Sequence, residues 1–272
     1  MKMFVLTIAL VLSLTSFSQN FSHIYTNIEP VKFIVTYAMQ YQPDSTDPND
    51  IKLGRMLLFI GDSTSKFVSR AFYINDTTTR KFTTVEQLQA YLLDSKRQIP
   101  GTLYQIFKNY PKGKITYTEH IPSSTYKYEE SIDMFDWILT GDTSSICGFK
   151  VYKATCDYSG RSWIAWFSPD LPYNDGPYKF NGLPGLIIKA HDTRNHYCFE
   201  MISIEKPAKE IMIEIEKKEY ITTTKSGFFH AQDYFREDII NRVKEAGGNS
   251  STQQTAALNM SKRNNPIELK RK

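Results

Sequence analysis

The chain has 272 residues, of which 41% are hydrophobic and 23% charged. This composition is typical of a globular protein and excludes a collagen-like or highly charged disordered chain. The formal net charge is +4, but the excess lies in Lys2 and in the basic residues after position 260, so residues 19–260 carry a net charge of −1. A near-neutral body gives no basic face of the kind that binds nucleic acid.

Residues 1–18 have the pattern of a secretory signal peptide. Lys2 provides the positive start, residues 3–14 form an apolar run, and residues 16–18 give a small-x-small cleavage site before Gln19. The run is shorter than the roughly 20 residues that a membrane-spanning helix needs. We therefore expect export to the periplasm, the outer membrane or the medium, and a mature chain without a transmembrane segment.

Three cysteines follow this segment: Cys147, Cys156 and Cys198. An odd number in an exported protein leaves at least one free thiol. Cys147 and Cys156 fall on one predicted strand and on opposite faces of it, so they cannot pair with each other. A disulfide between Cys147 and Cys198 stays open on sequence grounds.

The first half of the chain predicts a β-meander with one helix. The helix begins after Thr84, because Thr84 and Gln87 form a capping box and apolar residues follow at helical spacing. Strands are indicated by β-branched and aromatic residues between turn signals. They are predicted over residues 31–42, 51–60, 65–74, 103–107, 114–119, 126–129 and 134–139.

The clearest pattern is a hairpin formed by residues 148–158 and 161–167 around the two-residue turn Ser159-Gly160. Pairing about this turn places three pairs on one face, which we predict to be the core. The pairs are Cys156 with Trp163, Ala154 with Ala165, and Tyr152 with Phe167. Cys156 is then a buried apolar residue rather than a reactive thiol.

A second hairpin follows over residues 186–191 and 196–204, with one packed and one wet face. The packed face carries Ile188, Ala190, Tyr197, Phe199 and Met201, and the wet face carries Lys189, His191, His196, Cys198 and Glu200. A further strand is predicted over residues 210–222, and a helix over 231–246 that stops at Gly247-Gly248.

These elements predict a mainly β (α+β) domain over residues 19–246. Its large twisted antiparallel meander sheet of about ten strands is curled or partly closed, because an open sheet of that size exposes its edges. About two helices pack on the sheet. Residues 247–272 form a polar basic tail.

The two predicted hairpins are joined through a turn-rich stretch that contains Gly182-Leu183-Pro184-Gly185-Leu186-Ile187. Pro184 suits position i+1 of a type II turn, and Gly185 supplies the positive φ of position i+2. Gly182 lets the backbone approach a neighbouring segment closely, and Gly176-Pro177 makes a second corner. The stretch is predicted to set the strand register, and a loop that holds a ligand or partner is the alternative.

This hexamer, following Gly-Pro-x-x-Phe at residues 176–180, resembles the signature of the GLPGLI family of exported Bacteroidetes-type proteins. Similar positions run through residues 65–69, 146–154, 160–161, 165–167 and 264–269, which covers most of the mature chain. The resemblance implies an exported, β-rich protein without an assigned biochemical role, and it supplies no catalytic residues. It also implies that the segment from Pro266 to Leu269 docks on the body as a short strand.

Two groups of residues could carry chemistry. His191, His196 and Cys198, with Asp192 nearby, contain ligand types that bind zinc or copper, but their spacing matches no metal motif. Arg161 is predicted to clamp the loop through Asp170 or Asp175, with anion capture as its functional alternative. No nucleophile elbow, phosphate loop or dinucleotide fingerprint is present, and no cofactor is predicted.

A binding role is therefore favoured over catalysis. The residues expected to contact a ligand or partner lie in the turn-rich loop and are Tyr173, Tyr178, Phe180, Leu183 and Pro184. The protein is predicted to be a non-enzymatic envelope protein that uses a concave sheet face to bind an apolar small ligand or another envelope protein. The alternative is a hydrolase or metal-dependent enzyme with its site near His191 and His196.

Overall fold

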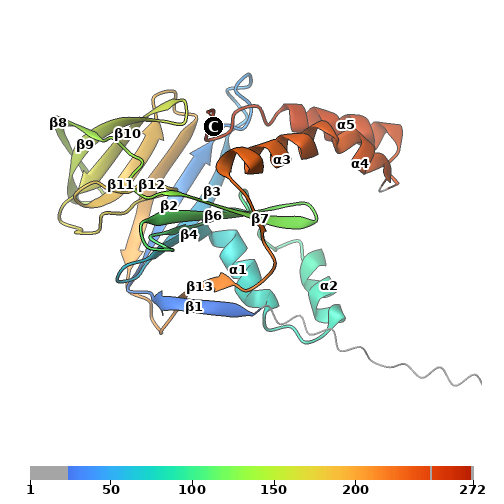
Figure 1. Cartoon of the computed structure of the whole chain (residues 1–272), viewed down its shortest axis with the longest axis horizontal. Coiled ribbons are helices and arrows are strands. Elements are labelled where there is room, and N and C mark those ends of the chain that lie inside the picture. Colours follow the sequence, from blue (N-terminus) through green and yellow to red (C-terminus); the bar gives the residue numbers. More distant parts are fainter. Residues whose placement is uncertain (1–23, 246, 271–272) are drawn as a thin grey trace, which may run out of the picture.

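The computed structural model describes residues 24–245 and 247–270, and it is built around a sheet of twelve strands (Figure 1). The predicted signal peptide lies outside the described residues. The strands of the sheet are β2 (Phe33–Tyr41), β3 (Lys52–Ile60), β4 (Ser65–Ser69), β5 (Gln105–Lys108), β6 (Lys114–Ile121), β7 (Ser124–Ser131), β8 (Ile138–Ile146), β9 (Phe149–Tyr158), β10 (Arg161–Ser168), β11 (Leu186–Asp192), β12 (Tyr197–Glu205) and β14 (Ile221–Thr222).

The sheet consists of two meanders joined side by side. Strands β2 to β7 pair in chain order, as do β8 to β12, and β2 pairs with β12 to make one sheet. The sheet is curled but not closed into a barrel, with β8 at one edge and β14 at the other. The short strand β14 runs parallel to β7, so the sheet is mixed. The predicted mainly β class is confirmed, with two more strands in the sheet than expected.

The two predicted hairpins form with the expected faces. Around Ser159-Gly160 the structure pairs Cys156 with Trp163, Ala154 with Ala165 and Tyr152 with Phe167. In the second hairpin Ile188, Ala190, Tyr197, Phe199 and Met201 are buried, whereas their alternating neighbours on the other face are partly exposed. Both registers follow from the alternation of apolar residues about a short turn. A slip of one residue would move every side chain to the opposite face of the sheet.

The curled sheet buries side chains on both faces. On β2, Val35, Tyr37 and Met39 belong to the large inner core, whereas Ile34 packs against a smaller outer core. The outer core is covered by a two-stranded ribbon of β1 (Tyr25–Pro30) and β13 (Met212–Glu216), and by helix α1 (Arg70–Thr79). Strands buried on both faces read as apolar runs, as residues 56–60 of β3 do.

Two predicted strands are wrong in part. Residues 65–74 leave the sheet after Ser69, whose hydroxyl accepts a hydrogen bond from the amide of Phe72 and caps helix α1. Residues 210–222 divide into β13 and β14, which belong to different sheets. In both segments β-branched and aromatic residues suited a strand, and long-range packing decided where the strand ended.

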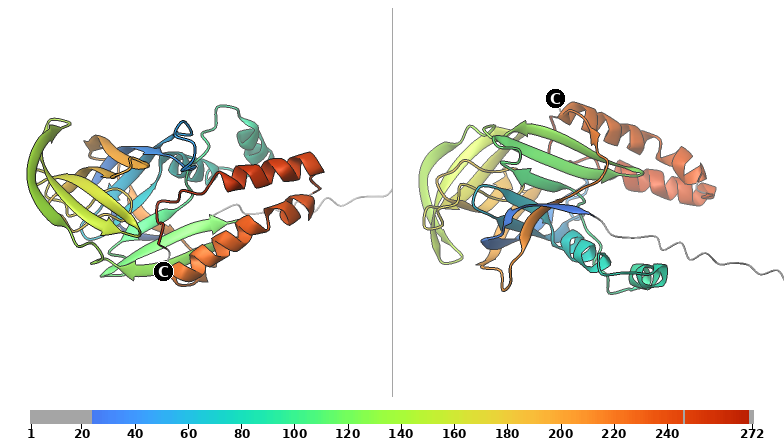
Figure 2. Two further views of the ribbon diagram at one scale, coloured as in Figure 1. Left: turned by 90° about the horizontal axis from the view of Figure 1, so that it is seen from above. Right: turned by 60° about the horizontal axis from the view of Figure 1, so that its bottom comes forward.

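The helices also differ from the prediction. The capping box of Thr84 and Gln87 is present and begins α2 (Val85–Leu93). The helix predicted over residues 231–246 is instead α3 (Lys225–Glu237), capped by Thr224, followed by α4 (Ile239–Glu245). A further helix, α5 (Ser250–Ser261), lies beside α4, and together these helices extend away from the sheet (Figure 2). Among the described residues, no helix is long and apolar enough to cross a membrane.

The cysteines allow a direct test of this packing. All three are free: Cys156 is buried, and Cys147 lies exposed in the turn between β8 and β9. Burial raises the pKa of the Cys156 thiol to about 12, which suppresses the reactive thiolate. In native protein at neutral pH we expect a thiol reagent to label Cys147 and to leave Cys156 unlabelled until the chain unfolds. Mass spectrometry after labelling measures this, and native labelling of Cys156 would contradict the packing.

Candidate functional site

The Gly182–Ile187 motif lies where the loop after β10 enters β11. Gly185 has a φ of +146°, a value that glycine adopts without the strain that other residues incur. A Cβ atom at this position would lie 2.2 Å from the carbonyl oxygen of Ser168. The amide of Gly185 donates a hydrogen bond to the carbonyl of Leu183 at 2.8 Å. The predicted positive φ is present, although it is wider than the roughly +80° of a type II turn.

The predicted ligand loop is mostly interior. Tyr178, Phe180 and Leu183 are no more than 1% exposed and belong to the inner core, whereas Tyr173 is half-buried and Pro184 exposed. These aromatic and aliphatic side chains fill the concave face of the sheet. Tyr178, Phe180 and Leu183 therefore cannot contact a ligand at the surface, because the loop itself occupies the face that was expected to bind one.

Arg161 does not clamp the loop through Asp170 or Asp175. Its Nη1 donates to Asp192 at 2.8 Å, and both groups are about 2% exposed. Asp175 instead pairs with Lys108, whose ammonium also donates to the carbonyls of Gly176 at 2.5 Å and Phe180 at 3.1 Å. The prediction paired Arg161 with carboxylates near in sequence, whereas strand pairing of β10 with β11 places Asp192 beside it.

The remaining donors of Arg161 bind the end of the chain. We call residues 264–270 the C-terminal strap, because they cross back over the sheet after α5 (Figure 2). Nε of Arg161 donates to the carbonyl of Ile267 at 3.0 Å, and Nη2 donates to the carbonyl of Pro266 at 2.6 Å. The amides of Leu269 and Lys270 donate to the carbonyl of Ser159. The strap docks without forming a strand of the sheet.

Glu268 is the centre of the strap and is fully buried. Its carboxylate accepts from Lys179 at 2.6 Å and from the hydroxyls of Tyr178 at 2.6 Å and Tyr158 at 3.1 Å, and it also pairs with Lys225. Burial opposes ionisation of Glu268, but the two lysines outweigh this and lower its pKa to about 2. The cluster fastens the strap, a loop residue and helix α3 together.

The histidines proposed as metal ligands do not form a metal site. In His191, Nδ1 lies 3.2 Å from the carbonyl oxygen of Asp192, and in His196, Nδ1 lies 3.5 Å from Nη1 of Arg161. A guanidinium so close to His196 opposes a second cation. Cys198 lies opposite His191 in the β11–β12 pairing. Within the described ranges, no group of three or more His, Cys, Asp or Glu side chains is arranged to hold a metal ion.

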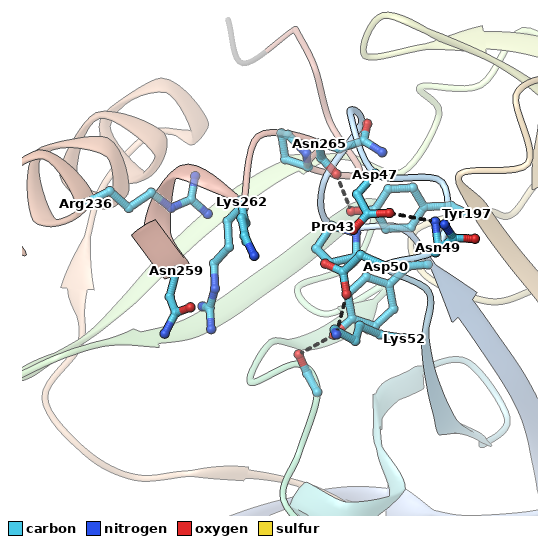
Figure 3. Close-up of a pocket in the computed structure, with 14 residues that line it drawn as sticks. Pro43, Asp47, Asn49, Asp50, Lys52, Tyr197, Arg236, Asn259, Lys262 and Asn265 are labelled. Carbon is cyan, nitrogen blue, oxygen red and sulfur yellow. Dashed lines mark hydrogen bonds and ion pairs between the residues drawn. The ribbon is translucent and has the colours of Figure 1, made fainter. Parts of the chain in front are cut away.

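An open cleft of about 640 Å³ separates the loop after β2 from helices α3 and α5. We call it the polar cleft. Figure 3 shows Arg236, Asn259 and Lys262 on the helical wall and Asp47 and Asp50 on the opposite wall. It is lined by Tyr41, Pro43, Asp47, Asn49, Asp50, Lys52, Gly101, Tyr197, Arg236, Asn259, Lys262, Arg263, Asn265 and Pro266.

The strap holds the two walls of the polar cleft together. The side-chain oxygen of Asn264 accepts from the amide of Ser45 at 2.8 Å and from its hydroxyl at 2.7 Å, and its amide donates to Asp44 at 2.8 Å. The backbone amide of Asn265 donates to the carbonyl of Pro43 at 3.0 Å. The end of α5 is thereby fixed against the loop after β2, which preorganises the cleft.

Aromatic rings give the cleft an apolar surface. Tyr41 and Tyr197 stack with centroids 6.0 Å apart and an interplanar angle of 18°. The hydroxyl of Tyr197 donates to the carbonyl of Asn265 at 2.8 Å, whereas that of Tyr41 donates to Gly101 at 3.3 Å. A volume of several hundred Å³ is within the range of ligand sites, and the lining of this cleft is more polar than is usual for them.

Comparisons with known proteins give a family match for the segment that contains the Gly182–Ile187 motif. A family model described as "Protein of unknown function (Porph_ging)" matches residues 159–189, which run from the β9–β10 turn into β11 and include the Gly182–Ile187 motif. The comparison with curated proteins gives no match. The partial family match agrees with the resemblance of the motif and adds no activity.

Two solved structures of PNGF-II are similar to this chain. The structure in space group P21 has a TM-score of 0.51 at 12% identity and covers 74% of this chain and 33% of that chain. The structure in space group C2 has a TM-score of 0.47 at 12% identity, covering 71% and 31%. This chain thus spans about a third of the length of the structures it matches. At this identity the likeness concerns the fold alone.

Sequence reasoning did not find the polar cleft. Its walls come from residues 41–52, Gly101, Tyr197 and the segment from Arg236 to Pro266, which share no local motif. The only signal was the excess of basic residues near the end of the chain, two of which, Lys262 and Arg263, line the cleft. Their position beside Tyr41 depends on helix α5 and on the docking of the strap.

Proposed function

We propose that this protein is an exported, GLPGLI-type binding or assembly protein that is not an enzyme, and that it engages its partner in the polar cleft. The observation that supports this best is the cleft itself, whose two walls are held by the hydrogen bonds of Asn264 and Asn265. A preorganised site loses less entropy when it binds. The cleft replaces the concave sheet face as the binding site, because the turn-rich loop fills that face.

The titratable groups with the tightest surroundings have structural roles. Lys108 donates to Asp175, Gly176 and Phe180, and burial lowers its pKa. Glu268 and Lys179 hold the strap. The shifted pKa values of Lys108 and Glu268 follow from fastening the loop and the strap, whereas a functional site would need groups that a ligand can reach.

An obstructed cleft tests the proposal. Asn259 is exposed and lines the cleft, whereas Gln254 is exposed on the same helix outside it. We expect Asn259→Trp to abolish retention of the partners that wild type captures from native envelope, and Gln254→Trp to retain them, with equal melting temperatures. The captured set is identified by mass spectrometry, and the recovered protein should begin at Gln19. An unchanged set with Asn259→Trp would overturn the proposal.

A further inference from the structure

The carboxylates that line the polar cleft have partners within the protein, whereas some of the cationic side chains do not form ion pairs among the described residues. Four cationic side chains and two carboxylates line it. The carboxylates are occupied: Asp50 pairs with Lys52, and Asp47 accepts from the backbone amide of Asn49 at 2.9 Å. Arg236 lies 3.5 Å from Asp233. The cationic side chains are therefore less fully paired than the carboxylates.

Lys262 and Arg263 are the two cations without an ion pair among the described residues. Both are exposed and follow the last turn of α5. The carbonyl end of a helix carries a partial negative charge, which offsets part of their potential, while Arg236 and Lys52 are offset by Asp233 and Asp50. The nearby Asp44 already accepts from Thr46 and Asn264. The helical wall is left positive.

The polar groups of the cleft fit an extended peptide. The side-chain amides of Asn49 and Asn259 lie on opposite walls and can each donate to and accept from a peptide group. The ring of Tyr41, which also lines the cleft, offers an apolar contact. An acidic side chain on such a peptide would reach the ammonium of Lys262 or the guanidinium of Arg263.

The strap itself shows how this face holds a segment of chain that carries a carboxylate. Tyr197 and Arg161 donate to the backbone carbonyls of Asn265, Pro266 and Ile267, and lysines receive the carboxylate of Glu268. Asn265 and Pro266 also line the polar cleft, so the cleft continues from the groove that the strap occupies.

Resting on the proposed function, we infer that the partner enters the polar cleft as an extended acidic peptide segment, with its carboxylates at Lys262 and Arg263. The peptide amides contact Asn49 and Asn259, and an apolar side chain contacts Tyr41. Attraction between opposite charges speeds association and weakens with salt.

Two labelled peptides test this inference by fluorescence polarisation. One alternates glutamate with serine, and its isostere has glutamine in place of glutamate. Wild type should bind the acidic peptide at least about tenfold more tightly, as expected for one or two charge-assisted contacts. The preference should shrink as salt is raised.

Charge-matched variants distinguish direct contact of the peptide with Lys262 and Arg263 from attraction to the overall positive charge of the protein. Lys262→Gln with Arg263→Gln should abolish the preference for the acidic peptide. Lys209→Gln with Lys244→Gln removes the same charge from exposed positions outside the cleft and should preserve it. Equal binding of both peptides by wild type, or equal loss in both double variants, would overturn the inference.

A third probe and the tryptophan variants distinguish the remaining outcomes. An oligogalacturonate that binds wild type while neither peptide does would assign the cleft to acidic saccharides and refute the peptide inference. If Asn259→Trp removes captured partners but the acidic peptide shows no preference, the inference fails and the proposed function stands. If Asn259→Trp leaves capture unchanged, the proposed function fails with it.

Discussion

Glu268→Gln should destabilise the protein by about 3–5 kcal/mol, as expected when one partner of a buried ion pair is removed. Glutamine preserves the shape of the side chain but leaves Lys179 and Lys225 with less negative charge around them. Lys179 is fully buried, so it cannot turn to solvent. Chemical denaturation followed by tyrosine or tryptophan fluorescence measures the free energy of unfolding, and the midpoint should fall.

A matched carboxylate provides the control for this variant. Glu245 on α4 is exposed and forms no ion pair among the described residues, so Glu245→Gln should change stability by less than about 0.5 kcal/mol. If both variants unfold at the same denaturant concentration, the Glu268 cluster does not hold the strap as the structure indicates.

The same cluster predicts a pH dependence. The folded pKa of Glu268 is about 2, below the ordinary value of 4.5. A depressed pKa means that the unfolded chain binds a proton more readily, so this stabilisation is complete above about pH 4.5 and is lost as pH falls toward 2. In wild type the melting temperature should fall across that window, and in Glu268→Gln the fall should be smaller. An equally steep fall in both proteins would contradict the assignment.

Gly185→Val should destabilise the protein by about 3 kcal/mol or more, from positive-φ strain together with overpacking against β10. A Cβ atom would meet the carbonyl oxygen of Ser168 at 2.2 Å and the nitrogen of Pro169 at 2.8 Å. Both are backbone atoms, which cannot move aside as a flexible side chain would. Alanine should therefore already be poorly tolerated.

Gly54 is the control for Gly185. It lies on β3 without positive φ, and a Cβ atom there would have no neighbour within 4 Å. Gly54→Ala should keep the wild-type melting temperature or raise it slightly, because alanine lowers the entropy of the unfolded chain. A wild-type melting temperature for Gly185→Val would show that the motif does not require glycine at this position.

Hairpins were predictable to single-residue register because the two strands are joined by a few residues. The turn Ser159-Gly160 leaves one alignment that puts Cys156, Trp163 and Ala165 on one face, and the structure has it. The end of β4 was not predictable in this way. Residues 65–74 are rich in β-branched and aromatic residues, as a strand would be, and the cap at Ser69 with the outer core decided in favour of helix α1.

Very little of the candidate site could be predicted from the sequence. The predicted loop residues Tyr178, Phe180 and Leu183 are of types that suit either a binding surface or a core, and burial decides between these. Arg161 was expected to clamp the loop through a carboxylate near in sequence, whereas it pairs with Asp192 and binds the strap. The sequence shows an excess of basic residues near the end of the chain, but only the docked strap places Lys262 and Arg263 in the same cleft as Tyr41.

The sequence by itself determined the β-rich class, the two hairpins and the glycine requirement of the Gly182–Ile187 motif, because alternation and backbone strain act over a few residues. Tertiary structure alone decided the pairing of β2 with β12, the filling of the concave face and the docking of the strap. Tyr41 and Tyr197, which pair between β2 and β12, are 156 positions apart, and Lys179 and Glu268 are 89 positions apart. Such contacts form only when the whole core and its buried charges assemble together.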